Sequence, residues 1–198
     1  GRYFIQAANQ LEGTGIDLMK MGQPGVPEID AYIVENLKEN DTVGFDGRVM
    51  NTKAALAYKS VFDLAHLNMN VNLDLVNDVW QDRPELPSTP TFHYAEKFSG
   101  ESMESKLARL RAFLKENHVD SIVLTSVDQI AWLYNLRAHD IPNFPVALAY
   151  SIVSLDSAAI YMDASRLDEL SQKEFNKNNV KVCGYNDIYE DTKALENS

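Results

Sequence analysis

Short strand-like runs alternate with amphipathic helical patterns along most of this sequence, and this alternation limits the possible folds. Ile29, Ile33 and Leu37 recur at four-residue spacing, which predicts an amphipathic helix from Pro27 to Lys38. A β-rich run from Thr42 to Phe45 follows and predicts a strand. Strands that alternate with helices are typical of α/β domains, in which helices flank a sheet. We therefore expect an α/β fold with largely parallel or mixed sheets between helices.

The remaining elements of the first half continue this pattern. Residues from Arg2 to Ala7 favour β structure and predict a strand, and the helix-favouring residues after them end at Gly13. We also predict strands at residues 16–21 and 69–73, and a helix at residues 52–67.

Periodicity disappears between Gln81 and Ser102, where prolines accumulate. Such a stretch is typical of an extended connector. We place a domain boundary there, with residues 1–88 holding the first domain and its connector and residues 89–198 holding the second.

The second half begins with an amphipathic helix that Ser102 is expected to cap. Its apolar stripe consists of Met103, Leu107, Leu110 and Leu114. Further strands are expected at residues 121–124, 145–155, 158–162 and 180–185, and further helices at residues 126–134, from Ser165 and from Asp187.

A faint internal repeat links the two halves. Tyr3 to Ala7 and Ile160 to Ala164 are similar runs, each followed by an expected helix, strand and second helix. Each half lacks counterparts of part of the other. We therefore expect both chain ends to fall inside domains, with at least the first domain truncated.

The net charge limits the partners that the chain can bind, and the cysteine content indicates its cellular compartment. The chain has 198 residues with 18 Lys and Arg against 29 Asp and Glu, a net charge of −11. An acidic balance argues against nucleic acid or an anionic membrane as a partner. No apolar run approaches the roughly 20 residues of a membrane span. Cys183, the one cysteine, excludes an internal disulfide framework, so we expect a cytoplasmic protein.

The usual catalytic and metal-binding motifs are absent from the sequence. The histidines lie far apart and none has a zinc-type spacing: His66, His93, His118 and His139. The sequence has no Gly-x-Ser-x-Gly elbow, and Gly13-Thr-Gly15 ends a helix-like run where a dinucleotide loop would begin one. We therefore assign no catalytic residue and no metal ligand to this chain.

One segment, residues 128–145, is a candidate for binding. It brings aromatic groups, a guanidinium and carboxylates into a helix-to-strand loop, and loops of this kind on a rigid sheet commonly carry binding residues. The alternative is structural, with Trp132 in the core and Arg137 paired with Asp140 or Asp128.

This segment also carries a family resemblance. Asp128-Gln-Ile-Ala-Trp-Leu-Tyr-Asn-Leu-Arg137, followed by Asp140-Ile and Pro145-Val, resembles a region of the three-domain cytosolic aminopeptidase P family, the Xaa-Pro aminopeptidases of creatinase/prolidase type. Further stretches agree in collinear order, at residues 1–7, 75–84, 98–102 and 106–111.

The resemblance implies two creatinase-type N-terminal α/β domains followed by a pita-bread catalytic domain that lies outside this chain. In that family the catalytic domain holds two divalent metal ions, usually manganese, and removes the N-terminal residue from peptides with proline second. We expect the parent protein to be a metallo-aminopeptidase and this chain alone to be inactive, without metal ligands. The implied partners are proline-containing peptides, the parent's own catalytic domain and a second copy in a homodimer.

The resemblance also implies which residues face the substrate cleft. Arg137 and Asp140 match family positions, and Asn135 and Trp132 support them. A guanidinium at residue 137 could anchor a peptide carbonyl or carboxylate through its fork of donors. Ala138 stands where the family typically has glycine, which adds a side chain to this loop.

A second function class stays open. A pseudo-peptidase relative would use the same domains to bind protein partners without catalysis. The presence or absence of the Asp, Asp, His, Glu, Glu ligand set in the parent protein distinguishes the two.

Overall fold

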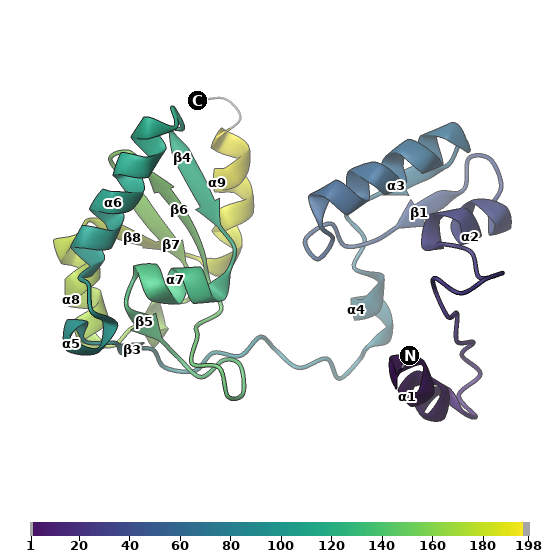
Figure 1. Ribbon diagram of the computed structural model, residues 1–198, viewed down its shortest axis with the longest axis horizontal. Coiled ribbons are helices and arrows are strands. Elements are labelled where there is room, and N and C mark those ends of the chain that lie inside the picture. Colours follow the sequence, from purple (N-terminus) through teal and green to yellow (C-terminus); the bar gives the residue numbers. More distant parts are fainter. Residues whose placement is uncertain (1, 196–198) are drawn as a thin grey trace. The chain divides into compact units, whose positions relative to one another are not determined.

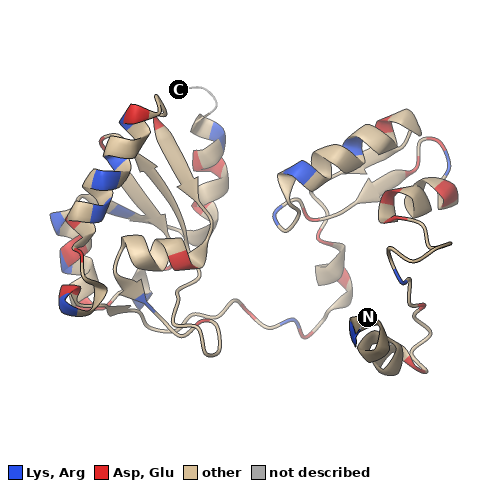
Figure 2. Ribbon diagram, in the orientation of Figure 1, with Lys and Arg blue, Asp and Glu red and all other residues tan. Residues whose placement is uncertain are grey.

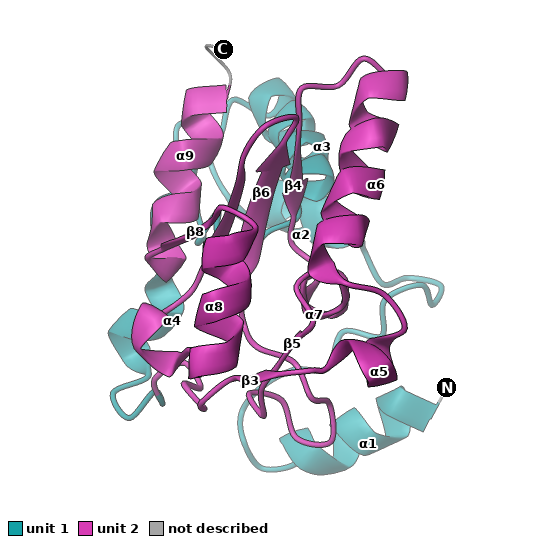
Figure 3. Ribbon diagram, turned by 90° about the vertical axis from the view of Figure 1, so that its left-hand side faces the viewer, with its two compact units in different colours: residues 1–84 teal, residues 85–198 magenta. Residues whose placement is uncertain are grey.

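The computed structural model describes residues 2–195 and divides into two compact units. The boundary lies between Pro84 and Glu85 (Figure 3), a few residues before the one expected between residues 88 and 89. Among the described residues, no helix is long and apolar enough to cross a membrane.

Unit 1 combines helices with one pair of short strands (Figure 1). Its elements are α1 (Arg2–Leu11), α2 (Ile29–Asn36), β1 (Thr42–Gly44), α3 (Thr52–Leu64), β2 (Asn68–Asn70) and α4 (Leu75–Val79).

The strand pair of unit 1 is parallel. β1 and β2 run side by side with Val43 opposite Met69, and α3 connects them. The Asn51 side chain caps α3 by accepting a 3.2 Å hydrogen bond from the Ala54 backbone N–H. Gly44 lies at the end of β1, where a Cβ would be 2.6 Å from Leu73 Cδ1, so the Leu73 side chain would have to shift to admit a larger residue. The predicted helix at 52–67 and the strands at 42–45 and 69–73 are confirmed in position, although each observed element is shorter.

Two strand predictions in unit 1 are wrong. Arg2 to Ala7 belongs to helix α1, and Ile16 to Met21 forms turns and irregular structure. A strand needs a partner for its backbone N–H and C=O groups, and no described strand pairs with either segment. In α1 these groups bond within the helix, and Phe4, Ala7 and Leu11 share its partly buried face. The repeat therefore fails at its first element, since Ile160 lies in a strand.

Unit 2 is built on a mixed four-stranded sheet (Figure 1). Its elements are β3 (Phe92–His93), α5 (Glu96–Ser99), α6 (Met103–Glu116), β4 (Ser121–Leu124), α7 (Val127–Leu133), β5 (Leu136–Arg137), β6 (Tyr150–Ser154), β7 (Ala158–Tyr161), the 3₁₀ turn η1 (Ala164–Arg166), α8 (Glu169–Lys177), β8 (Val180–Cys183), η2 (Tyr185–Asp187) and α9 (Ile188–Ala194).

The sheet has the strand order β4-β6-β7-β8, with β7 and β8 parallel and the other neighbours antiparallel. Side chains alternate between its two faces along each strand. Val153 and Ile160 pack with α6, α7 and α8 in the larger core, whereas Ile152 and Tyr161 pack with Ile188 of α9 in the smaller one. Figure 3 shows α6, α7 and α8 on one side of the sheet. The expected α/β architecture with a mixed sheet between helices is confirmed.

Three helices of unit 2 are expected to begin at a serine, and only Ser102 caps its helix through its side chain. Ser102 caps α6 by accepting from the Ser105 backbone N–H at 3.2 Å. The Ser126 side chain makes no capping hydrogen bond, although α7 begins at the next residue. Ser165 lies inside the turn η1, and Asp168 occupies the residue before α8.

Candidate functional site

The predicted cleft residues lie around the junction of α7 and β5. Trp132 is in the last turn of α7, Asn135 lies between the two elements, and Arg137 ends β5. Asp140 follows in the loop after β5. The short strand β5 pairs antiparallel with β3, with Phe92 opposite Arg137.

Asn135 turns the chain from α7 into β5. Its φ of 48° is in the left-handed region, which asparagine tolerates better than most residues. Its buried side chain donates from Nδ2 to the Glu101 carbonyl at 2.9 Å and accepts from Lys106 Nζ at 2.6 Å. The Asn135 carbonyl accepts from the Tyr94 N–H at 2.8 Å. These contacts fix the direction of the loop.

Lys106 is a buried cation that holds this turn. It is 1% exposed and donates to the Trp132 carbonyl at 2.7 Å as well as to Asn135. Burial lowers the pKa of its ammonium, since desolvation disfavours the charged form. Lys106 is not among the site residues predicted from the sequence. A signal was present, because Met103, Leu107 and Leu110 put residue 106 on the apolar face of α6.

Trp132 is partly exposed between two cations. It is 45% exposed, so the alternative that placed it in the core is wrong. Lys106 Nζ lies 4.6 Å from the ring centroid and the Arg109 guanidinium carbon 5.4 Å from it. Cations at these distances are attracted to the face of an indole.

Arg137 reaches back to the end of α7. Its Nη1 donates to the carbonyls of Ala131 at 2.5 Å and Leu136 at 2.9 Å, and its guanidinium lies 4.6 Å from the Tyr94 ring centroid. Cations are favoured at helix C-termini, where carbonyls lack intrahelical partners. Burial lowers the pKa of this guanidinium. Among the described residues Arg137 forms no ion pair, so the structural alternative that paired it with Asp140 or Asp128 is wrong.

Asp140 pairs instead with Arg166, at the end of η1. Its carboxylate accepts from Arg166 Nη2 at 2.5 and 2.7 Å, from Thr89 Oγ1 at 2.6 Å and backbone N–H at 3.1 Å, and from the Leu148 N–H at 2.7 Å. Burial raises the pKa of the carboxyl, but these hydrogen bonds outweigh burial and hold the pKa below its ordinary value. Because the Asp140 side chain is fully buried, its role within this unit is to fix the loop.

The structure thus brings Trp132, Asn135 and Arg137 together at one end of α7 and sets Asp140 in a separate buried cluster. This arrangement can bind a hydrogen-bond acceptor such as a carbonyl or carboxylate and hold it in position, since Arg137 is a cation with a planar fork of donors. Within residues 2–195, no group of three or more His, Cys, Asp or Glu side chains could hold a metal ion.

Comparison with known proteins gives consistent matches. A family model described as the creatinase/prolidase N-terminal domain matches residues 82–198. A probable Xaa-Pro aminopeptidase P from Pyricularia oryzae is 36% identical over all of this chain and 32% of its own length. Aminopeptidase P1 from Arabidopsis thaliana is 32% identical over 98% of the chain and 30% of its own length.

A solved structure agrees with these sequence matches. The X-prolyl aminopeptidase of Caenorhabditis elegans, described as a cytosolic enzyme with a di-nuclear active site, superposes with a TM-score of 0.90 at 32% identity. The superposition covers all of this chain and 32% of that protein, so the chain spans about a third of the length of its relatives. The resemblance drawn from the sequence is confirmed: the chain belongs to the creatinase/prolidase N-terminal domain family.

Proposed function

We propose that this chain is the non-catalytic N-terminal region of a metal-dependent Xaa-Pro aminopeptidase, which removes the N-terminal residue from peptides with proline second. The observation that carries this proposal is the agreement of the whole chain, in sequence and in fold, with about a third of the C. elegans enzyme. Since that enzyme is described as cytosolic, we also propose a cytoplasmic location.

Catalysis belongs to the remainder of the parent protein in this account. The C. elegans enzyme has a di-nuclear active site, and the described residues of this chain contain no group suited to hold a metal. We therefore place both divalent ions, proposed to be manganese, on ligands outside residues 2–195. The present chain contributes positioning and no chemical step.

The α7–β5 junction is the part of the chain proposed to face the substrate cleft. Arg137 uses Nη1 on two carbonyls, and the structure gives no acceptor among the described residues for its Nε and Nη2 donors. Those donors suit a peptide carbonyl or carboxylate. Trp132 and Asn135 support the junction, and Asp140 fixes the loop that follows. Homodimerisation, with the parent's own catalytic domain packed beside this region, completes the proposal.

The test uses the isolated 198-residue chain. Incubated with Mn²⁺ and an Xaa-Pro peptide, it is expected to release no N-terminal residue. Turnover that a chelator abolishes would contradict the proposal, because it would require metal ligands within this chain. Reading the parent coding sequence for the Asp, Asp, His, Glu, Glu set separates an active enzyme from a pseudo-peptidase that uses these domains to bind proteins.

A further inference from the structure

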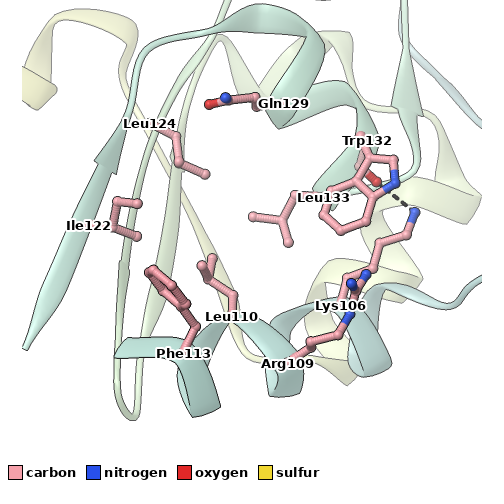
Figure 4. A pocket seen from close by; sticks show the side chains of 9 residues that line it. All are labelled: Lys106, Arg109, Leu110, Phe113, Ile122, Leu124, Gln129, Trp132 and Leu133. Atoms are coloured by element: carbon pink, nitrogen blue, oxygen red, sulfur yellow. Dashed lines mark hydrogen bonds between the residues drawn. The ribbon is translucent and has the colours of Figure 1, made fainter. Parts of the chain in front are cut away.

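Buried polar side chains of a folded protein usually have a hydrogen-bond partner. Lys106 is an example, since it donates to the Trp132 carbonyl along the dashed line in Figure 4. Three buried side-chain atoms have no such partner within the part of the chain that the structure describes, and all three lie in unit 2: His93 Nδ1, Asp168 Oδ1 and Ser171 Oγ. Leaving a buried polar atom unpaired is costly, so these atoms indicate a binding site for a polar group.

Two of the three atoms lie at the start of α8. Asp168 is the residue before this helix, yet its side chain makes no capping hydrogen bond. Ser171 is 1% exposed and shares the buried face of α8 with Phe175. Figure 2 shows charged residues on α8, and Lys173 among them is exposed. Because residues three apart are neighbours on a helix, Asp168 Oδ1 and Ser171 Oγ are buried on the same side of the first turn.

His93 approaches this turn from β3, which packs against α8 (Figure 3). Two residues earlier, Thr91 donates from its N–H and its Oγ1 to the Arg166 carbonyl, at 2.8 and 3.0 Å. Side chains two residues apart in an extended segment point to the same face. Phe92 points to the other face, where its ring lies 5.6 Å from the His139 ring. The His93 side chain therefore points, as Thr91 does, toward the segment that leads into α8.

The chemistry of the three atoms suits one water molecule. A carboxylate oxygen only accepts, an unprotonated imidazole nitrogen accepts, and a hydroxyl can donate. Buried waters typically make about three hydrogen bonds to polar groups that otherwise lack partners. We propose that one internal water binds between β3 and α8, donates to Asp168 Oδ1 and His93 Nδ1, and accepts from Ser171 Oγ. This bonding assigns the imidazole proton of His93 to Nε2.

Other occupants fit these atoms less well. The site offers one imidazole and one carboxylate, and within residues 2–195 no group of three or more His, Cys, Asp or Glu side chains could hold a metal ion. An anion would lie against the Asp168 carboxylate, which repels it. The water completes the start of α8 and joins this helix to β3, the strand that pairs with β5 and so with Arg137. Because the site is enclosed within unit 2, it does not depend on the proposed aminopeptidase function.

The first test uses the unmodified 198-residue chain. A high-resolution crystal structure is expected to show one water about 2.7–3.2 Å from each of the three atoms. Nitrogen-15 NMR of the His93 imidazole is expected to show an unprotonated Nδ1 and a protonated Nε2. Direct hydrogen bonds among the three side chains, a metal ion or an anion at this position, or a proton on Nδ1 would overturn the proposal.

A double-mutant cycle tests whether one molecule links the side chains. Ser171→Ala and His93→Phe are each expected to raise the unfolding equilibrium constant about tenfold, because each removes one partner and leaves the others short of a hydrogen bond. The double variant should raise it by much less than the product of the two effects, about a hundredfold, since both changes act on one network. Effects that multiply in full would overturn the link.

Ser151→Ala is the matched control, because the Ser151 hydroxyl is equally buried but bonds directly to Tyr134 and to the Ala159 carbonyl. Its effect on the unfolding equilibrium constant should multiply in full with that of His93→Phe. Oxygen-17 relaxation dispersion, which counts long-lived internal waters, should show one fewer in the Ser171→Ala, His93→Phe double variant and an unchanged number in Ser151→Ala. An unchanged number in the double variant would contradict the site. If a variant fails to fold, the crystal structure of the unmodified chain decides the question.

Discussion

Asp140 and Arg166 form a buried ion pair that joins the loop after β5 to the turn before α8, with Oδ2 and Nη2 2.5 Å apart. The side chains are 0% and 7% exposed. Arg166 Nε also donates to the Thr89 carbonyl at 2.9 Å, and Asp140 accepts twice from Thr89. One ion pair therefore fixes three segments that are far apart in sequence.

Asp140→Asn is expected to lower the free energy of unfolding by about 3–5 kcal/mol, because it leaves the Arg166 guanidinium buried without its counter-charge. Urea denaturation measures the change. Glu104→Gln is the matched control, since the Glu104–Lys177 pair is exposed and spans 3.4 Å; it should change stability by less than about 1 kcal/mol. Equal losses for the two variants would show that burial of the Asp140 pair does not matter.

The same carboxylate should contribute to acid unfolding. Its folded pKa lies below the unfolded value of about 3.9, so its stabilisation is fully present above that pH and is lost as the pH falls through the folded pKa. Unfolding free energies of the wild type and Asp140→Asn, measured from pH 6 downward, should therefore converge below about pH 4. A difference that stays constant into strong acid would be inconsistent with a depressed pKa.

Asn135 allows its backbone and side-chain roles to be separated. Asn135→Gly keeps the left-handed turn but removes the hydrogen bonds to Glu101 and Lys106, which should cost about 1–3 kcal/mol. Asn135→Ala should be about 1 kcal/mol less stable again, because its Cβ disfavours a φ of 48° even after allowing for the greater freedom of glycine in the unfolded chain. Thermal unfolding of both variants measures this difference in stability. An alanine variant as stable as the glycine variant would show that the left-handed backbone at residue 135 does not disfavour a Cβ.

The elements best predicted from sequence are those whose own residues determine them. Helix α6 follows directly from its four-residue apolar spacing and the Ser102 cap, and strand β4 from its short β-branched run. Arg2 to Ala7 could not be predicted in this way. β propensity describes how a residue suits a paired and partly buried strand, and this segment has no described partner.

In the candidate site, too, local features could be predicted from the sequence and long-range contacts could not. The sequence indicated the α7–β5 region, because Trp132, Asn135 and Arg137 lie close together along the chain. It could not indicate that Asp140 pairs with Arg166, since 26 residues separate them and only the return of the chain through β6 and β7 brings them together. The contact of Lys106 with Asn135, 29 residues apart, depends on tertiary packing in the same way.

Unit 2 should fold by itself. A fragment of residues 85–198 retains the sheet, both cores and the Thr89 contacts, so it should unfold cooperatively in urea. A fragment of residues 92–198 lacks Thr89 and Thr91, which contribute hydrogen bonds to Asp140 and Arg166, and should be less stable by about 2–4 kcal/mol. Equal stability would place the boundary of the second domain after Thr91, beyond the one proposed between residues 88 and 89.

The most direct test of the account is the kcat/KM of a chimera in which this chain replaces the matching third of the C. elegans aminopeptidase. The chimera is expected to hydrolyse an Xaa-Pro peptide. Arg137→Ala is expected to lower kcat/KM by about tenfold through loss of a charged hydrogen bond, and the exposed control Lys173→Ala to leave it unchanged. A folded, metal-loaded chimera without activity would contradict the assignment of this chain as the N-terminal region of such an enzyme. Full activity of the Arg137→Ala chimera would contradict the role of that residue in the substrate cleft.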